Sequence, residues 1–180
     1  IAMRIMEAVQ GNRGLFGYRV IKPMDTFLAR LFLEVLLYTV VFVLLLGGLW
    51  WWGVPVELYR PLEFFTVVAL LSLMGFGLGI LFCVIGEALP EVKLFIRILF
   101  IPLYLLSGIL FPISRLPAEY HDLLLWNPVL HAGELSREAF FRGYASVSGV
   151  SLGFVAEVAV VLLFGGVVAY RLRRLELVAQ

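Results

Sequence analysis

The feature that most constrains this chain is a series of apolar runs, each long enough to cross a lipid bilayer as a helix. The first has no charged residue from Val35 to Trp52, and this stretch of about 18 residues would form about 27 Å of helix. Charged residues make up only 15% of the chain and the mean hydropathy is +1.01, whereas about 25% of the residues of a soluble domain are charged. We therefore predict an all-α integral membrane protein.

Four complete transmembrane helices are predicted, at residues 27–52, 62–85, 94–112 and 147–170. Residues 1–26 precede them and consist of a helix tail followed by a basic connector that glycines interrupt. Because the first ten residues have the composition of a helix already under way and the chain begins with isoleucine, we expect it to lack an N-terminal region of the whole protein. Residues 1–180 would then form a single transmembrane domain, truncated at its N-terminus.

Positive charge is concentrated towards the two ends of the chain. The residues concerned are Arg4, Arg13, Arg19, Lys22, Arg30, Arg171, Arg173 and Arg174. An even number of spans places both ends, including the C-terminus, on one side of the membrane, and the excess of Lys and Arg predicts that this side is the cytoplasm. The tryptophans Trp50–Trp52 then face outward. Because the net charge is only +1, the chain has no overall basic field, and we expect no nucleic-acid partner.

The segment at residues 114–143 differs from the apolar runs on either side of it. It contains both histidines of the chain, many charges and an Asn127–Pro128 step that divides it into two helical pieces. Each piece is too short to cross a bilayer, so we predict a re-entrant helical hairpin on the outer side, acting as a gate. Two pairs at helical spacing would neutralise charge on the second piece, Glu134–Arg137 and Glu138–Arg142. The alternative is a solvated helix outside the membrane.

Two motifs suggest chemistry that the surrounding sequence does not support. Gly75, Gly77 and Gly79 resemble a phosphate-binding loop, but no Lys-Ser or Lys-Thr follows, and the small-xxx-small spacing of Gly75 and Gly79 favours close approach of another helix instead. His121 and His131 lie near carboxylates, yet their spacing matches no metal signature. We expect the histidines to form hydrogen bonds at the membrane interface. The alternative is a membrane-embedded enzyme that acts on lipid-linked sugars through one of them.

Aromatic side chains are frequent on several of the predicted spans. Because sugar rings stack on aromatic rings, Tyr38, Phe42, Trp50 and Phe111 are candidates for lining a glycan path. Lipid-facing anchors and core packing explain most aromatic residues of membrane proteins equally well.

The segment from Ser107 to Tyr144 resembles the permease subunit of capsular polysaccharide ABC exporters, within the type-2 ABC exporter superfamily. The resemblance rests on Ser107–Ile109, Phe111–Pro112, Leu116–Pro117, Leu125–Pro128, His131, Glu134, Arg137 and Phe140–Phe141. The upstream stretches Gly11–Arg13, Lys22–Asp25 and Ala29–Arg30 resemble the cytoplasmic connector of that family. The similarity covers nearly the whole chain.

This resemblance implies a protein of six spans in its full length, working as a homodimer with two separate ATPase subunits that hold ATP and Mg²⁺. The chain itself would then have no catalytic residue, no metal and no cofactor. The connector would dock on the ATPase as a coupling helix, through Arg13, Leu15, Phe16 and Tyr18. The gate would be formed by Trp126, Asn127, Pro128, His131, Glu134 and Arg137.

The function implied is export of a lipid-linked capsular polysaccharide across the bacterial inner membrane. Membrane lipids and the periplasmic export proteins of a capsule system would be further partners. Export of O-antigen or of another cargo by a related type-2 permease is the alternative within the same superfamily.

Overall fold

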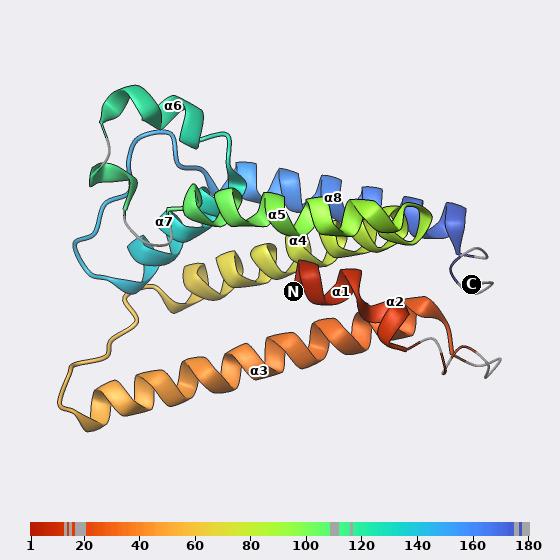
Figure 1. Cartoon of the computed structure of the whole chain (residues 1–180). Coiled ribbons are helices and arrows are strands. Elements are labelled where there is room, and N and C mark those ends of the chain that lie inside the picture. The colour runs from red at the N-terminus through yellow and green to blue at the C-terminus, as the bar shows by residue number, and fades with distance from the viewer. Residues whose placement is uncertain are drawn as a thin grey trace.

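The computed structural model describes residues 1–12, 14, 16, 21–108, 112–115, 117–174 and 177, and the regular secondary structure among these residues is entirely helical. The elements are α1 (Ala2–Met6), α2 (Ala8–Gly11), α3 (Pro23–Trp51), α4 (Pro61–Ala88), α5 (Pro90–Leu105), η2 (Ile113–Arg115), η3 (Ala118–Tyr120), α6 (His121–Leu124), α7 (Pro128–Phe140) and α8 (Leu152–Arg173). Figure 1 shows α3, α4, α5 and α8 running along a common direction. We call the end with α6 and α7 the hairpin end, and the end with α2 and the C-terminus the connector end.

Among the described residues, three helices are long and apolar enough to cross a membrane, namely α3, α4 and α8. Proline occupies the first turn of α3 and α4, where its missing N–H costs nothing and its fixed φ favours the helix. Ser151 begins α8 as an N-cap, and its hydroxyl accepts a hydrogen bond from the backbone N–H of Phe154 at 3.4 Å. The all-helical architecture predicted from the apolar runs is therefore confirmed.

Helix α5 covers only part of the span predicted at residues 94–112, because it ends at Leu105 after 16 residues. Pro102 lies inside it, the hydroxyl of Ser107 donates to the carbonyl of Tyr104 at 2.5 Å, and Gly108 adopts a φ of 68°. A backbone of that conformation favours glycine and ends a helix. At 1.5 Å per residue the helix is about 24 Å long, and it is shorter than α3, α4 and α8.

Helix α4 is packed between α8 and α1 through the glycines singled out in the sequence. A Cβ atom on Gly77 would lie 2.5 Å from the Leu162 carbonyl, and one on Gly166 would lie 2.5 Å from the Gly77 oxygen. On another side of α4, a Cβ on Gly79 would lie 2.7 Å from Ile5. The close approach predicted for the face with Gly79 is confirmed on the side of α1. The contact of Gly77 with α8 lies at a glycine outside the predicted face.

The largest buried apolar cluster lies at the connector end. It joins the predicted helix tail, now seen as α1 and α2, to α3, α4 and α8. Its members include Ile5, Val9, Phe27, Ile80, Cys83 and Tyr170. The Phe27 and Tyr170 rings meet edge to face with their centroids 6.0 Å apart. This cluster fixes the start of α3 against the rest of the bundle.

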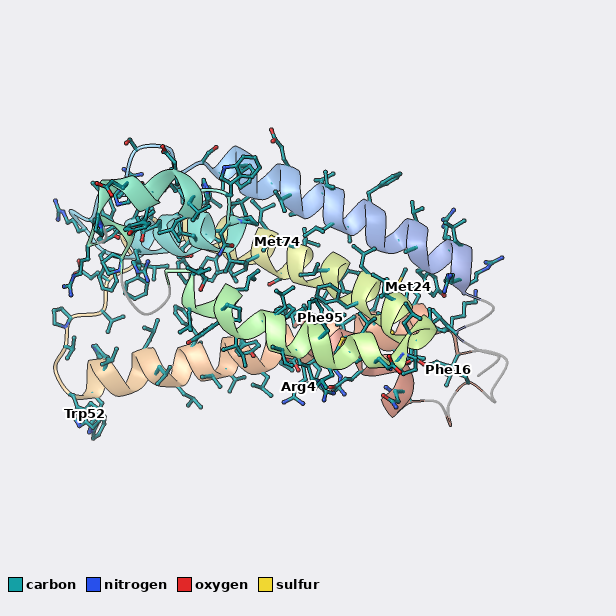
Figure 2. All side chains as sticks on the ribbon, turned by 45° about the horizontal axis from the view of Figure 1, so that its top comes forward. Arg4, Phe16, Met24, Trp52, Met74 and Phe95 are labelled. Atoms are coloured by element: carbon teal, nitrogen blue, oxygen red, sulfur yellow. The ribbon has the colours of Figure 1, made fainter. Side chains whose placement is uncertain are left out.

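Helix α3 leaves the other helices towards its C-terminal end, where Trp52 is 83% exposed (Figures 1 and 2). Near the hairpin end, α3 contacts the other helices mainly through the Phe42 ring. This ring stacks on Phe64 of α4 with centroids 5.4 Å apart, and its centroid lies 6.5 Å from that of Phe140 of α7. Most of its other apolar side chains are exposed. Within a bilayer these side chains face lipid or another protein surface.

Candidate functional site

The candidate site is the predicted gate hairpin at residues 114–143. Its second piece, α7, begins at Pro128, at the break predicted from the Asn127–Pro128 step. Asn127 is the N-cap, and its side-chain oxygen accepts from the Val129 N–H at 3.0 Å. The helix ends at Phe140, because Phe141 has an extended backbone, three residues before Gly143. The first piece consists of η3 and the single turn α6.

Glu134, which is fully buried (0% exposed), is the centre of a polar network inside the hairpin. Its Oε1 accepts from Arg137 Nη1 at 2.9 Å and from the backbone N–H of Ile113 at 3.2 Å. Its Oε2 accepts from the Tyr144 hydroxyl at 2.6 Å. One carboxylate thus joins α7 to η2 and to the loop before α8. The predicted Glu134–Arg137 pair is confirmed.

The second predicted pair has a different partner. Glu138 accepts a hydrogen bond from the hydroxyl of Ser146 at 2.6 Å, whereas Arg142 is exposed beyond the end of α7. The spacing favoured Glu138–Arg142 only if the helix continued to Arg142. Because the helix ends at Phe140, the loop that follows brings Ser146 to this carboxylate instead.

Two hairpin side chains complete the C-terminal end of α5. Asn127 Nδ2 donates to the Leu106 carbonyl at 3.4 Å, and Arg137 Nη2 donates to the Gly108 carbonyl. The last carbonyls of a helix have no partner within it and need one elsewhere. The hairpin therefore binds the backbone just beyond the last residue of α5.

The C-terminal end of α7 is fastened in a similar way by the loop between α3 and α4. The backbone N–H groups of Arg60 and Tyr59 donate to the carbonyls of Ala139 at 2.8 Å and Phe140 at 3.4 Å. Together with the Asn127 cap, these bonds hold α7 at both ends. Helix α7 is therefore fixed in place beside α4 and α8.

Both histidines bind backbone groups. His131 is 3% exposed, and its Nε2 lies 2.7 Å from the Leu125 carbonyl while its Nδ1 accepts from the Ser151 N–H at 3.0 Å. A carbonyl only accepts and an amide N–H only donates, so His131 is neutral with its proton on Nε2. His121 Nε2 lies 3.1 Å from the Ile113 carbonyl. These contacts support the predicted hydrogen-bonding role.

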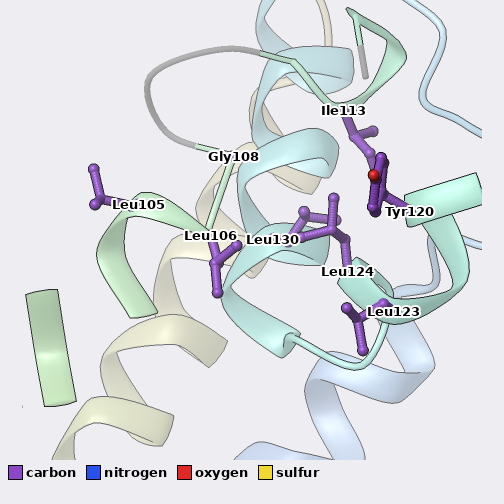
Figure 3. A pocket seen from close by; sticks show the side chains of 8 residues that line it. All are labelled: Leu105, Leu106, Gly108, Ile113, Tyr120, Leu123, Leu124 and Leu130. Carbon is purple, nitrogen blue, oxygen red and sulfur yellow. The ribbon is translucent and has the colours of Figure 1, made fainter. Parts of the chain in front are cut away.

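No cluster of three or more His, Cys, Asp or Glu side chains in the described ranges has a metal-binding arrangement. An apolar cavity of about 220 Å³ lies between the end of α5 and the first hairpin piece (Figure 3). It is lined by Leu105, Leu106, Gly108, Ile113, Tyr120, Leu123, Leu124 and Leu130. This cavity therefore presents an apolar surface next to the polar network around Glu134.

Trp126, another predicted gate residue, lies apart from the polar network around Glu134. It is 82% exposed and borders a shallow depression shared with Asp122, Leu125 and Phe154. The structure thus joins Glu134 to Arg137 in one network, places buried His131 in separate backbone contacts and Asn127 at the start of α7, and leaves Trp126 at the surface. This side chain is free to contact lipid, cargo or protein.

The other predicted site residues are spread over the chain. Tyr38 and Trp50 are exposed on α3, and Phe42 is half-buried in the aromatic contacts described above. In the connector, Phe16 is half-buried and packs against the apolar cluster of the connector end. The remaining candidates lie outside the described residues, namely Arg13, Leu15, Tyr18 and Phe111.

Tyr144 is a site residue that sequence analysis missed. It lies ten positions after Glu134, beyond the end of α7, so no helical spacing indicates the contact. Burial and the hydrogen bond to Glu134 raise the pKa of Tyr144 to about 12. A neutral phenol donates to the carboxylate, whereas a phenolate would repel it.

We expect Tyr144 to ionise well above the ordinary tyrosine pKa of 10.0. Between pH 10 and about pH 12 the folded protein then binds more protons here than the unfolded chain, so the stability that Tyr144 contributes falls as the pH rises through this window. Ultraviolet titration of tyrosinate, compared with Tyr144→Phe, measures the difference. If Tyr144→Phe lacks a titration step near pH 10 and keeps the step near pH 12, the pKa of about 12 does not belong to Tyr144.

Comparison with known proteins adds the family. Residues 14–141 match the ABC-2 type transporter family. The polysialic acid transport protein KpsM of Escherichia coli is 42% identical over 96% of this chain and 67% of its own length. The capsule polysaccharide export inner-membrane proteins BexB of Haemophilus influenzae and CtrC of Neisseria meningitidis serogroup A are 28% and 27% identical, over 89% and 74% of this chain.

The chain spans 61% of the length of BexB and 51% of that of CtrC. The family match includes most of the connector, α3, α4, α5 and all of α7, so it contains Glu134, Arg137 and Ile113 and ends before Tyr144. The helical fold, the apolar spans and these matches agree with one another. The chain belongs to the ABC-2 type transporter family.

Proposed function

We propose that this chain is the membrane-embedded part of a permease that exports a capsular polysaccharide across the bacterial inner membrane. The observation that carries the proposal is the similarity to KpsM, BexB and CtrC, whose names describe transport of polysialic acid and export of capsule polysaccharide. The cargo is a lipid-linked glycan, and ATP hydrolysis on a separate ATPase subunit drives its movement. The chain contributes the path and the gate.

The proposed orientation places the connector end in the cytoplasm and the hairpin end on the periplasmic side. Arg171 and Arg173 in the last turn of α8 and the basic residues of the connector support this orientation. Trp50–Trp52 then lie at the outer interface, where tryptophan is enriched. In this arrangement α5, although short, is the third of the four predicted spans, and α8 is the fourth.

The proposed assembly is a homodimer of permeases with two ATPase subunits, passing the glycan to periplasmic export proteins. The exposed apolar surface of α3 supports contact with lipid and with a second copy, because its side chains gain no burial within this chain. Tyr38, Trp50 and Trp126 are exposed and therefore available to a sugar chain. Phe42 is assigned to packing instead, since its ring stacks on Phe64.

The connector is the proposed docking surface for the ATPase, and Gly14 tests it without disturbing the core. A Cβ added at Gly14 meets no atom within 4 Å and Gly14 is exposed, whereas Phe16 also packs inward. We expect Gly14→Trp to weaken ATPase binding by about 1–3 kcal/mol, the usual cost of a misfit in packed surfaces, with little effect on unfolding. Titration of the purified ATPase against permease in nanodiscs measures the change.

Gly48→Trp is the matched control, since this position on α3 also has open space around it. It lies in the lipid-facing part of the helix, far along the chain from the connector. The control should bind the ATPase with wild-type affinity. Equal binding by Gly14→Trp and Gly48→Trp would exclude the connector near Gly14 as a docking surface.

Co-purification tests the proposed function as a whole. The full-length protein that contains this chain should retain the ATPase subunit in detergent and change its rate of ATP hydrolysis. A permease that neither binds an ATPase nor alters ATP turnover would overturn the proposal. Glycan analysis of the cargo separates capsule export from O-antigen export.

A further inference from the structure

Two cations on α5 reach back to the start of the chain. Lys93 and Arg97 are one helical turn apart, so they lie on one face of α5. Arg97 forms an ion pair with Glu7, and Lys93 Nζ lies 3.5 Å from Gln10 Oε1. Glu7 and Gln10 are likewise one turn apart. These two contacts, which we call the α5 clamp, join α5 to the α1–α2 segment at two points.

The clamp is also fixed to α4. Lys93 Nζ forms an ion pair with Glu87 at 2.5 Å, and the two side chains are only 15% and 5% exposed. The Lys93 side chain lies directly on Gly86, where a Cβ would be 2.7 Å from Lys93 Cε. The start of α5 is therefore held by a largely desolvated charge pair as well as by the exposed Arg97–Glu7 pair.

The position of Glu7 gives the clamp its significance. Glu7 is the residue at which α1 ends and α2 begins, and α2 leads directly into the connector. Any displacement of the connector would therefore reach α2 before it reaches α1. Arg97 holds that same residue, and Lys93 holds the far end of α2 at Gln10.

Along its length α5 has few buried apolar side chains, although the Phe100 ring meets the Phe82 ring of α4 edge to face with centroids 5.8 Å apart. Ile96 is its one buried residue, whereas Leu94, Phe95, Ile98 and Ile101 are exposed, and Phe95 projects from the helix in Figure 2. Polar contacts at the two ends take the place of that packing. At the hairpin end these are the hydrogen bonds from Asn127 to Leu106 and from Arg137 to Gly108.

We propose that Lys93 and Arg97 are positioning residues that make α5 follow the connector, so that α5 carries a displacement of the α1–α2 segment to the gate hairpin. This inference rests on the proposed function. The α5 clamp attaches α5 at the connector end. The hydrogen bonds to the carbonyls of Leu106 and Gly108 attach it at the hairpin end. Helix α5 then moves as a rigid helix that polar contacts attach at both ends.

A charge swap in the full-length permease–ATPase complex tests the inference. Spin labels at Leu123→Cys in the hairpin and Trp52→Cys on α3, both exposed positions, are introduced with Cys83→Ser, and their distance is measured with and without ATP. The wild-type distance should change on ATP binding. Arg97→Glu and Glu7→Arg should each strongly reduce the change, and the double variant should restore it, because the opposite charges meet again.

Coupling between sites is typically worth about 5- to 150-fold, so we expect each single variant to lower ATP-driven hairpin displacement by about tenfold. Exposed ion pairs contribute little to folding, and Arg97 and Glu7 are 52% and 39% exposed. The unfolding temperature should therefore stay within a few degrees of wild type. The matched control is the exposed pair Arg60–Glu63 at the other end of the bundle, whose reversal should leave the distance change intact.

The outcomes separate the inference from the proposed function. If the wild type binds the ATPase and both single variants keep the full distance change, the clamp does not transmit the displacement and the inference is wrong. A wild-type complex with ATP-dependent turnover but no hairpin displacement overturns it equally. Failure of the wild type to bind any ATPase would instead contradict the proposed function itself.

Discussion

Replacing Glu134 by alanine should unfold the hairpin framework. The change removes the carboxylate that accepts from Arg137, Tyr144 and the Ile113 N–H. Breaking a buried ion pair by removing one partner costs about 3–5 kcal/mol, and the half-buried guanidinium of Arg137 is left without this partner. We expect a large fall in the free energy of unfolding in detergent, together with loss of export in cells.

Glu138→Ala is the matched control, one turn further along the same helix. Glu138 is half-buried and accepts from Ser146, so its loss removes one hydrogen bond at a cost of about 1 kcal/mol. If Glu134→Ala proved as stable as Glu138→Ala, the network around Glu134 would not hold the hairpin together. Glu134→Gln adds a finer comparison, since it keeps the shape and loses the charge.

Replacing Gly77 by leucine should separate α4 from α8. Even the first side-chain atom would lie 2.5 Å from the Leu162 carbonyl and the Leu163 nitrogen, which are backbone atoms that cannot turn aside. Overpacking a well-packed core costs about 1–3 kcal/mol and occasionally more, and we expect the upper end here because the obstacle is backbone. Thermal unfolding monitored by circular dichroism in detergent measures the loss.

Gly48→Leu provides the control for this substitution, because nothing lies within 4 Å of a Cβ at that position. Glycine is unfavourable in the interior of a helix, so this change should stabilise α3 slightly. Similar unfolding temperatures for Gly77→Leu and Gly48→Leu would show that α4 and α8 do not approach as closely as described.

Much of the architecture could be predicted from local sequence. The uncharged run before Trp52 predicts α3, because only a long apolar helix satisfies its own backbone in lipid. The Asn127–Pro128 step predicts the start of α7, since asparagine caps a helix and proline suits its first turn. The Glu134–Arg137 contact follows from helical spacing.

Contacts between distant segments could not be predicted in this way. Arg97 lies 90 positions from Glu7 in the sequence, and nothing in the spacing of either residue indicates the other. The partner of Gly77 was hidden for the same reason, because the sequence indicated a small-residue face without indicating α8. Helix α5 ends early because Ser107 and Gly108 act through hydrogen bonding and φ, which hydropathy does not measure.

The measurement that tests the central claim most directly is the location of the polysaccharide in cells that lack the protein. Deletion of the gene in the source bacterium, followed by glycan analysis of intact and lysed cells, distinguishes export from synthesis. We expect the polysaccharide to accumulate inside the cell and to return to the surface when the full-length protein is supplied. Normal surface polysaccharide in the deletion strain, or complete absence of the polymer inside and outside, would contradict an export permease.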